Sequence, residues 1–185
     1  MGVWDNILDL NGIDKLQKES PKEPGLFGDS NRVAQGMIPL CGMNVAFRAE
    51  LTPAFFFLPD IWIDGWQLSR HDDIWGGYIL ERLMAKRGDL LRFGRPVVEH
   101  TKQTNLNRVI MLEHYMHLMA MYFYDLVDAA VDAVRPADYR DMFAAFAAEY
   151  RSRAAAGRHP AHYRRAFVEL GETIQRWSDA FVDPA

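Results

Sequence analysis

The most regular alternation of apolar and polar positions lies near the C-terminus. From about Pro160 to Val182, apolar side chains recur at spacings of 4, 3, 4, 3 and 4 residues. This spacing is typical of one face of an amphipathic helix, and a proline is well tolerated in the first turn. The pattern therefore predicts a helix over 160–182 with one apolar seam. The seam consists of Tyr163, Phe167, Leu170, Ile174, Trp177 and Phe181.

Three more helices are predicted upstream. Residues 107–134 form one long apolar-rich segment, and residues 137–155 carry an apolar face with Phe143 and Phe146. A shorter helix is predicted from about residue 72 to 86. Its start has the S-x-x-D arrangement of a capping box, and Gly88 ends it. The second half of the chain therefore reads as a helical bundle.

The first half has a different pattern. Residues 1–36 are irregular, because charges, prolines and glycines alternate too closely for a regular element. The short apolar stretch 44–47 suggests a buried strand, and residues 89–100 read as a strand, a turn and a second strand. We therefore expect a mixed α/β region over 1–106 and a helical region over 107–185.

Composition narrows the class of protein. A chain of 185 residues, 49% of them apolar, can build a core of ordinary size. Its net charge of −4 argues against nucleic acid as the main partner. The single cysteine, Cys41, cannot form an internal disulfide, and neither a signal peptide nor an apolar run of membrane-spanning length is found. We therefore expect a cytoplasmic protein.

The segment RHDDIWGG, residues 70–77, carries the first candidate chemistry. Asp72 and Asp73 lie at a predicted helix start, where each acid gains about 0.3–1 kcal/mol from the helix dipole without any function. Gly76 and Gly77 are harder to explain, because each costs about 1 kcal/mol relative to alanine inside a helix. Such a helix needs something large close to its backbone, and this can be a ligand or a packed neighbour.

The remaining candidates are single side chains. His100 at a predicted strand end can ligate a metal, and Lys102 can contact a phosphate, although both residue types are common on surfaces without a task. His114 and His117 lie three residues apart beside Glu113, but the HExxH order is absent and packing is the simpler interpretation. The sequence contains no Walker loop, no GxGxxG and no CxxC pair.

Three segments resemble, in order and with similar spacing, successive blocks of the reversibly glycosylated polypeptides, which are the UDP-arabinopyranose mutases of plants and their microbial relatives. The segments are IPLCGMNVAFRAEL, SRHDDIWGGYIL and GRPVVEHTKQTN. The family's blocks read P-M-C-G-M-N-L-A-F, G-R-Y-D-D-M-W-A-G-W and G-L-P-Y-I-W-H-S-K-A-S-N-P. The matching residues are Cys41, Gly42, Met43, Asn44, Ala46 and Phe47, then Arg70, Asp72, Asp73, Trp75 and Gly77, then Gly94, Pro96, His100, Lys102 and Asn105.

The resemblance implies a GT-A-like, Rossmann-related glycosyltransferase that binds a UDP-sugar together with Mg²⁺ or Mn²⁺. In this interpretation Asp72 and Asp73 are the catalytic acids and His100 is a metal ligand. Positive groups and a metal would stabilise the diphosphate leaving group. The implied substrate-binding residues are Gly42, Asn44, Arg70, Trp75, Gly76, Gly77, Lys102 and Asn105.

The chain also departs from the family pattern. His71 stands where the family has tyrosine, Gly76 replaces alanine, and Glu99 replaces tryptophan. The family's nucleotide-binding half, with its acidic D-D-D motif, has no counterpart in residues 1–70. We therefore expect a portion of a glycosyltransferase or UDP-sugar mutase that needs a nucleotide-binding half in cis or in trans. The alternative is a non-catalytic partner subunit of an active homologue.

Overall fold

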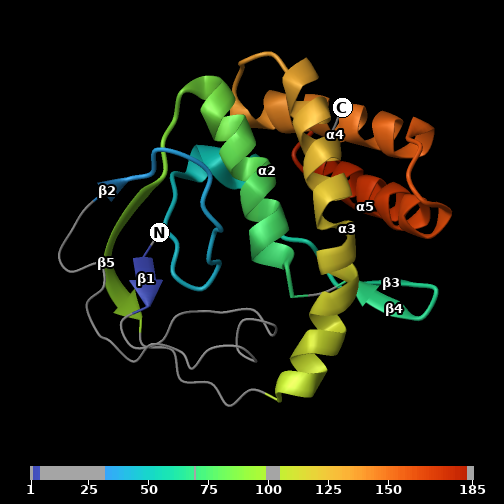
Figure 1. The fold of residues 1–185 in the computed structure, drawn as a ribbon. Helices are drawn as coiled ribbons and strands as arrows, with labels where there is room; N and C mark the ends of the chain where they lie inside the picture. The colour runs from blue at the N-terminus through green and yellow to red at the C-terminus, as the bar shows by residue number, and fades with distance from the viewer. Residues whose placement is uncertain (1, 5–31, 69, 99–104, 183–185) are drawn as a thin grey trace.

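The computed structural model describes residues 2–4, 32–68, 70–98 and 105–182 (Figure 1). Helices dominate this part of the chain, and the strands are short. In chain order the elements are β1 Gly2–Trp4, β2 Arg32–Val33, the 3-10 helix η1 Ala49–Ala54, β3 Ile61–Ile63, β4 Trp66–Leu68, α2 Asp72–Arg87, β5 Arg92–Val98, α3 Leu106–Ala133, α4 Tyr139–Ala156 and α5 Ala161–Asp179.

The four predicted helices are present, and local capping accounts for the end of α2 and for the starts of α3 and α4. Gly88 ends α2 with a left-handed φ of 77°, which glycine adopts without strain. The side chain of Asn105 caps α3 by accepting the N–H of Arg108, and that of Asp138 caps α4 by accepting the N–H of Asp141. The prediction of a helical second half is therefore confirmed.

The predicted Rossmann-related sheet is wrong for the described residues. They form a small mixed sheet in the order β1-β5-β2, in which β1 runs parallel and β2 antiparallel to β5. A separate hairpin pairs β3 with β4. Residues 44–47 form no strand, and the described part of the stretch predicted as two strands, residues 89–98, contains only β5. A Rossmann-type sheet needs several parallel strands joined by helices, and the described residues supply one parallel pair, β1 with β5.

One hydrophobic core joins the two halves of the chain. It contains residues of η1, β3, β4 and the four α-helices. The core therefore includes residues on both sides of the predicted boundary between 1–106 and 107–185. In Figure 1, α2 and α3 run beside each other, α4 packs against α3, and α5 packs against α4. The predicted seam of α5 supplies three fully buried residues: Phe167, Leu170 and Ile174. The indole N–H of Trp177 donates to the carbonyl of Pro53 at 2.8 Å and ties α5 to η1.

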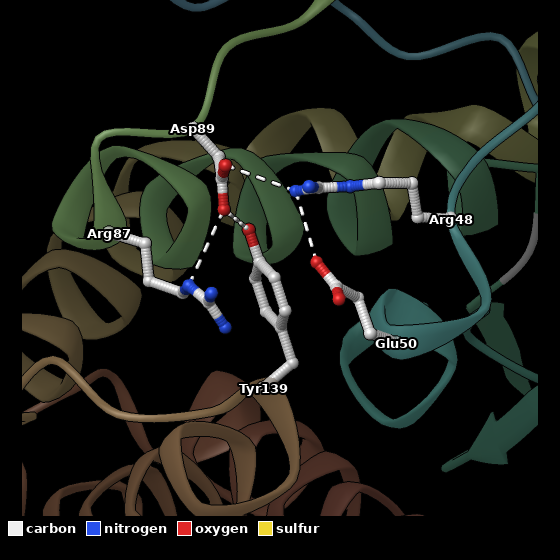
Figure 2. Close-up of polar contacts among 5 residues, drawn as sticks. All are labelled: Arg48, Glu50, Arg87, Asp89 and Tyr139. Atoms are coloured by element: carbon white, nitrogen blue, oxygen red, sulfur yellow. Dashed lines mark hydrogen bonds and ion pairs between the residues drawn. The ribbon is translucent and has the colours of Figure 1, made fainter.

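A polar network around Asp89 holds three segments together (Figure 2). Its carboxylate accepts hydrogen bonds from Arg48 at 3.0 Å and from the hydroxyl of Tyr139 at 2.7 Å, and it pairs with Arg87 at 3.4 Å. Arg87 also lies over the Tyr139 ring, 4.7 Å from its centre. The hydrogen bond from Tyr139 is the main reason that the pKa of Asp89 lies below its usual value. The network fastens the end of α2 to the start of α4.

Tyr139→Phe should lower the free energy of unfolding by about 1–2 kcal/mol, because the hydroxyl donates to a charged acceptor and the ring is 1% exposed. Urea unfolding followed by circular dichroism measures the change. Tyr122→Phe is the matched control, since Tyr122 is 40% exposed and its hydroxyl has no hydrogen bond to a described residue. Equal losses in the two variants would show that the bond to Asp89 contributes nothing.

Candidate functional site at the start of helix α2

The two acids of RHDDIWGG lie in the first turn of α2, and they have different surroundings. One carboxylate oxygen of Asp73 accepts the backbone N–H of Gly42 at 3.0 Å, so Asp73 ties the loop around residue 42 to the helix. Asp72 is half-buried, and its carboxylate has no hydrogen bond or ion pair with a described residue. His71 occupies the N-cap position without a capping hydrogen bond. Ser69, the serine of the predicted S-x-x-D capping box, lies outside the described residues.

The three glycines of the candidate site are positions where chain segments touch. A Cβ on Gly76 would lie 2.0 Å from the carbonyl oxygen of Phe56, and one on Gly77 would lie 2.4 Å from Cβ of Leu40. A Cβ on Gly42 would meet the Phe57 ring at 2.6 Å. Packed neighbours therefore account for these glycines in the structure.

Trp75 lies in the core and not on a surface. It is 1% exposed and stacks on Phe123, with ring centres 3.9 Å apart and planes inclined by 9°. Its indole N–H has no hydrogen-bond partner among the described residues. The side chain holds α2 against α3, and this packing explains the residue without a ligand.

The other candidate residues are spread over several contacts. Asn44 is half-buried, and its amide nitrogen has no partner within the described part of the chain. Asn105 caps α3. Arg70 turns toward α3, where its Nε donates to Glu113 Oε1 at 3.1 Å. His100 and Lys102 lie outside the described residues, so the structure does not place them relative to the acids.

Three side chains that the sequence interpretation did not group together converge beside Asp72. His71, Glu113 and His117 each offer a ligand atom, and these atoms lie within 4.8 Å of one another. We call this group the His71–Glu113–His117 cluster. The sequence signal was present: Glu113 and His117 are four residues apart and share one face of α3. The ring of His114 instead lies near that of Trp66, which agrees with the packing interpretation for this residue.

His71 is shielded from solvent. It is 5% exposed, and its ring meets that of His117 edge to face, with centres 4.7 Å apart. Burial, reinforced by the neighbouring His117, lowers the pKa of His71 from 6.5 to about 4. The ring is therefore neutral at pH 7 and keeps a lone pair available as an acceptor or a ligand.

An open hollow of about 310 Å³ lies at the other side of α3. Trp66 and Tyr115 stack in its wall, with ring centres 5.5 Å apart, and Asp64 and His114 add polar groups. Of the candidate residues from the sequence that the structure describes, His114 lines it, and the residues implied by the family resemblance do not. It is thus a separate feature from the start of α2.

Taken together, the fold and the site define a mainly helical protein with a small mixed sheet, an acidic helix start and a buried histidine–carboxylate group beside it. The family profile described as "Reversibly glycosylated polypeptide" matches residues 1–181. The chain belongs to this family, as the three sequence blocks indicated.

Curated relatives cover a smaller part of the chain. UDP-arabinopyranose mutase 1 of Arabidopsis thaliana is 31% identical over 106 residues, which is 56% of this chain and 29% of the relative. Similar values hold for UDP-arabinopyranose mutase 3 of the same plant, at 32%, and for probable UDP-arabinopyranose mutase 1 of Pisum sativum, at 31%. The match thus spans less than a third of each relative. Within the described residues, none of the helices combines the length and apolar character that crossing a membrane requires.

Proposed function

We propose that this chain is a portion of a nucleotide-sugar-dependent glycosyltransferase or UDP-sugar mutase and acts with a nucleotide-binding half supplied in cis or in trans. Family membership is the observation that carries the proposal. The match to less than a third of each mutase, and the lack of a Rossmann-type sheet among the described residues, support the need for a second half. The single thiol fits a cytoplasmic location.

In this proposal the two acids divide the work. Asp73 positions the loop through the Gly42 N–H, and Asp72, which has no described partner, faces the sugar and orients or deprotonates the attacking hydroxyl. Lys102 and the start of α2 contribute positive charge toward the phosphates. Mg²⁺ or Mn²⁺, with His100 among its ligands, would stabilise negative charge on the diphosphate.

The pair Asp72→Asn and Asp73→Asn tests this division of roles. Asp72→Asn should reduce turnover of the assembled enzyme by about 100-fold or more, the usual contribution of a general base, with an unchanged melting temperature. Asp73→Asn should lower the melting temperature, because a charged acceptor for the Gly42 N–H is replaced by a neutral one. Full activity of Asp72→Asn would refute the catalytic role of Asp72.

Calorimetry tests the requirement for a second half. The purified chain, alone and mixed with the product of any adjoining reading frame, is titrated with UDP-arabinopyranose with and without Mn²⁺. We expect heat of binding only from the mixture, and stronger binding with Mn²⁺. A mixture that neither binds the nucleotide-sugar nor turns it over would contradict the enzyme proposal.

An exposed apolar strip on α3 favours a second candidate, a non-catalytic partner of an active homologue. Met111, Leu118 and Met121 are 64%, 50% and 68% exposed, and their spacing places them along one side of the helix. A homologous subunit docked there would bury this strip. Leu118→Glu should then abolish copurification with the homologue without unfolding the chain. Retained copurification would remove the support that this strip gives.

A further inference from the structure

We propose that the His71–Glu113–His117 cluster binds a divalent transition-metal ion, with Zn²⁺ the best-suited, between the start of α2 and the middle of α3. This site is distinct from the proposed Mg²⁺ or Mn²⁺ ligand His100, and the inference does not depend on the proposed function. It rests on residues from two elements that are 42 or more positions apart in sequence and come together only in the folded chain.

The donor set selects the kind of metal. Two imidazoles and one carboxylate are ligands that Zn²⁺ and related borderline ions prefer, whereas Mg²⁺ and Ca²⁺ prefer oxygen ligands. Arg70 offsets the negative charge of Glu113, so the group as a whole is neutral when both histidines are neutral. A neutral site attracts hard cations weakly, and imidazole coordination then decides which ion is bound.

The three ligand atoms lie near one another, within 4.8 Å, before any ion is bound. Glu113 is held by Arg70 at Oε1, and its Oε2 lies 3.9 Å from Nε2 of His117 one helical turn away. Ligated carboxylates are commonly fixed in this way by a second partner. Ligand atoms around a tetrahedral ion at ~2.1 Å lie about 3.4 Å apart, so the cluster needs to contract by about an ångström.

A buried atom without a partner points to a missing ligand. Nε2 of His117 is shielded from solvent and forms no hydrogen bond to a described residue, and its distance to Glu113 is too long for one. Buried polar atoms are normally satisfied, and leaving one unsatisfied costs about 1–3 kcal/mol. A metal ion bound at Nε2 would remove this deficit. The His117 side chain as a whole is 31% exposed and gives an ion a route in.

The backbone that delivers Arg70 and His71 is itself unusual. Arg70 has a φ of 69°, in the left-handed region that residues with a Cβ rarely adopt. Strain of this kind is concentrated at functional sites. The backbone turn at Arg70 directs the side chains of Arg70 and His71 toward the same face of α3. Arg70 orients Glu113, and His71 completes the cluster.

A metal titration of the whole chain tests the inference. After dialysis against EDTA, the chain is titrated with Zn²⁺ by calorimetry against a chromophoric chelator, and with Co²⁺ by visible absorption. We expect one Zn²⁺ per chain, a Co²⁺ spectrum of low-symmetry coordination, and no competition from excess Mg²⁺. His117→Ala and Glu113→Gln should each weaken Zn²⁺ binding by about 100-fold or more, since loss of a supporting partner alone costs 10–100-fold.

His114→Ala is the matched control, because His114 lies on the same helix but faces Trp66. It should bind Zn²⁺ like the wild-type chain. No stoichiometric binding by the folded wild-type chain, or undiminished binding by a folded His117→Ala variant, would overturn the proposal. If Glu113→Gln fails to fold, the wild-type Co²⁺ spectrum and His117→Ala still decide. Since no nucleotide is present, the result is independent of UDP-sugar binding.

Discussion

Gly76→Ala should lower the free energy of unfolding by about 3 kcal/mol or more. The new Cβ would lie 2.0 Å from the carbonyl oxygen of Phe56, and a backbone oxygen cannot move aside as a flexible side chain can. Overpacking a core costs about 1–3 kcal/mol when side chains can rearrange, and more when the backbone must shift. The segment around Phe56 would have to leave α2, and this would also disturb the buried ring of Phe56.

Urea unfolding of Gly76→Ala beside Gly36→Ala measures this effect. Gly36 has no atom within 4 Å of its would-be Cβ, so its replacement should change stability by no more than a few tenths of a kcal/mol. Gly77→Ala should fall between the two, because its new Cβ meets the side chain of Leu40 and not a carbonyl. A Gly76→Ala variant as stable as wild type, but defective in UDP-sugar binding, would instead assign this glycine to a ligand.

The helical half was predictable because its information is local. The spacing of the apolar residues in α5, the cap at Asn105 and the stop at Gly88 can each be read from a few neighbouring positions. The sheet was not predictable, because β1 and β5 pair across about ninety residues and no local pattern specifies that partner. The expected Rossmann-related sheet came from the family resemblance and not from alternation along this chain.

The candidate site was likewise predictable from the sequence where its information is local, and not where it depends on contacts between distant segments. The sequence identified Gly76 and Gly77 as positions needing a close neighbour, and only the fold showed that the neighbours are Phe56 and Leu40. The spacing of Glu113 and His117 was readable as one helical face, but His71 joins them only through the turn before α2. Ligand groups assembled from separate elements are recognised by geometry, since no short motif contains all their members.

The second large effect concerns Glu81, a carboxyl group buried in the middle of α2. It is 6% exposed; one oxygen accepts the Ile38 N–H at 3.1 Å and the other has no partner among the described residues. Burial raises its pKa from 4.5 to about 7, although the hydrogen bond from Ile38 acts in the opposite direction. The folded chain therefore holds this proton at pH values where the unfolded chain has lost it.

The sign of the pH dependence follows from this difference. Between pH 4.5 and 7 the folded state binds one more proton at Glu81, so stability should fall by about 1.4 kcal/mol per pH unit, about 3 kcal/mol in all. Above pH 7 both states are ionised and the loss is complete. His71, whose pKa is lowered to about 4, has the opposite effect between pH 4 and 6.5. A comparison with Glu81→Gln isolates Glu81, because His71 contributes equally to both proteins.

Urea unfolding of wild type and Glu81→Gln from pH 4.5 to 8 measures the difference. The free energy of the variant relative to wild type should rise by about 3 kcal/mol across this range, whatever the offset caused by burying an amide. Glu169→Gln, whose carboxylate is half-exposed, should run parallel to wild type. If the stability of Glu81→Gln also runs parallel to that of wild type across the pH range, the charge on Glu81 is solvated in the folded chain by water or by a rearranged Ile38 segment. If the two stability curves diverge as the pH approaches 7, the folded chain holds a buried proton on Glu81. Burial raises the pKa of this carboxyl group in the folded chain only, and the amide of Glu81→Gln does not titrate.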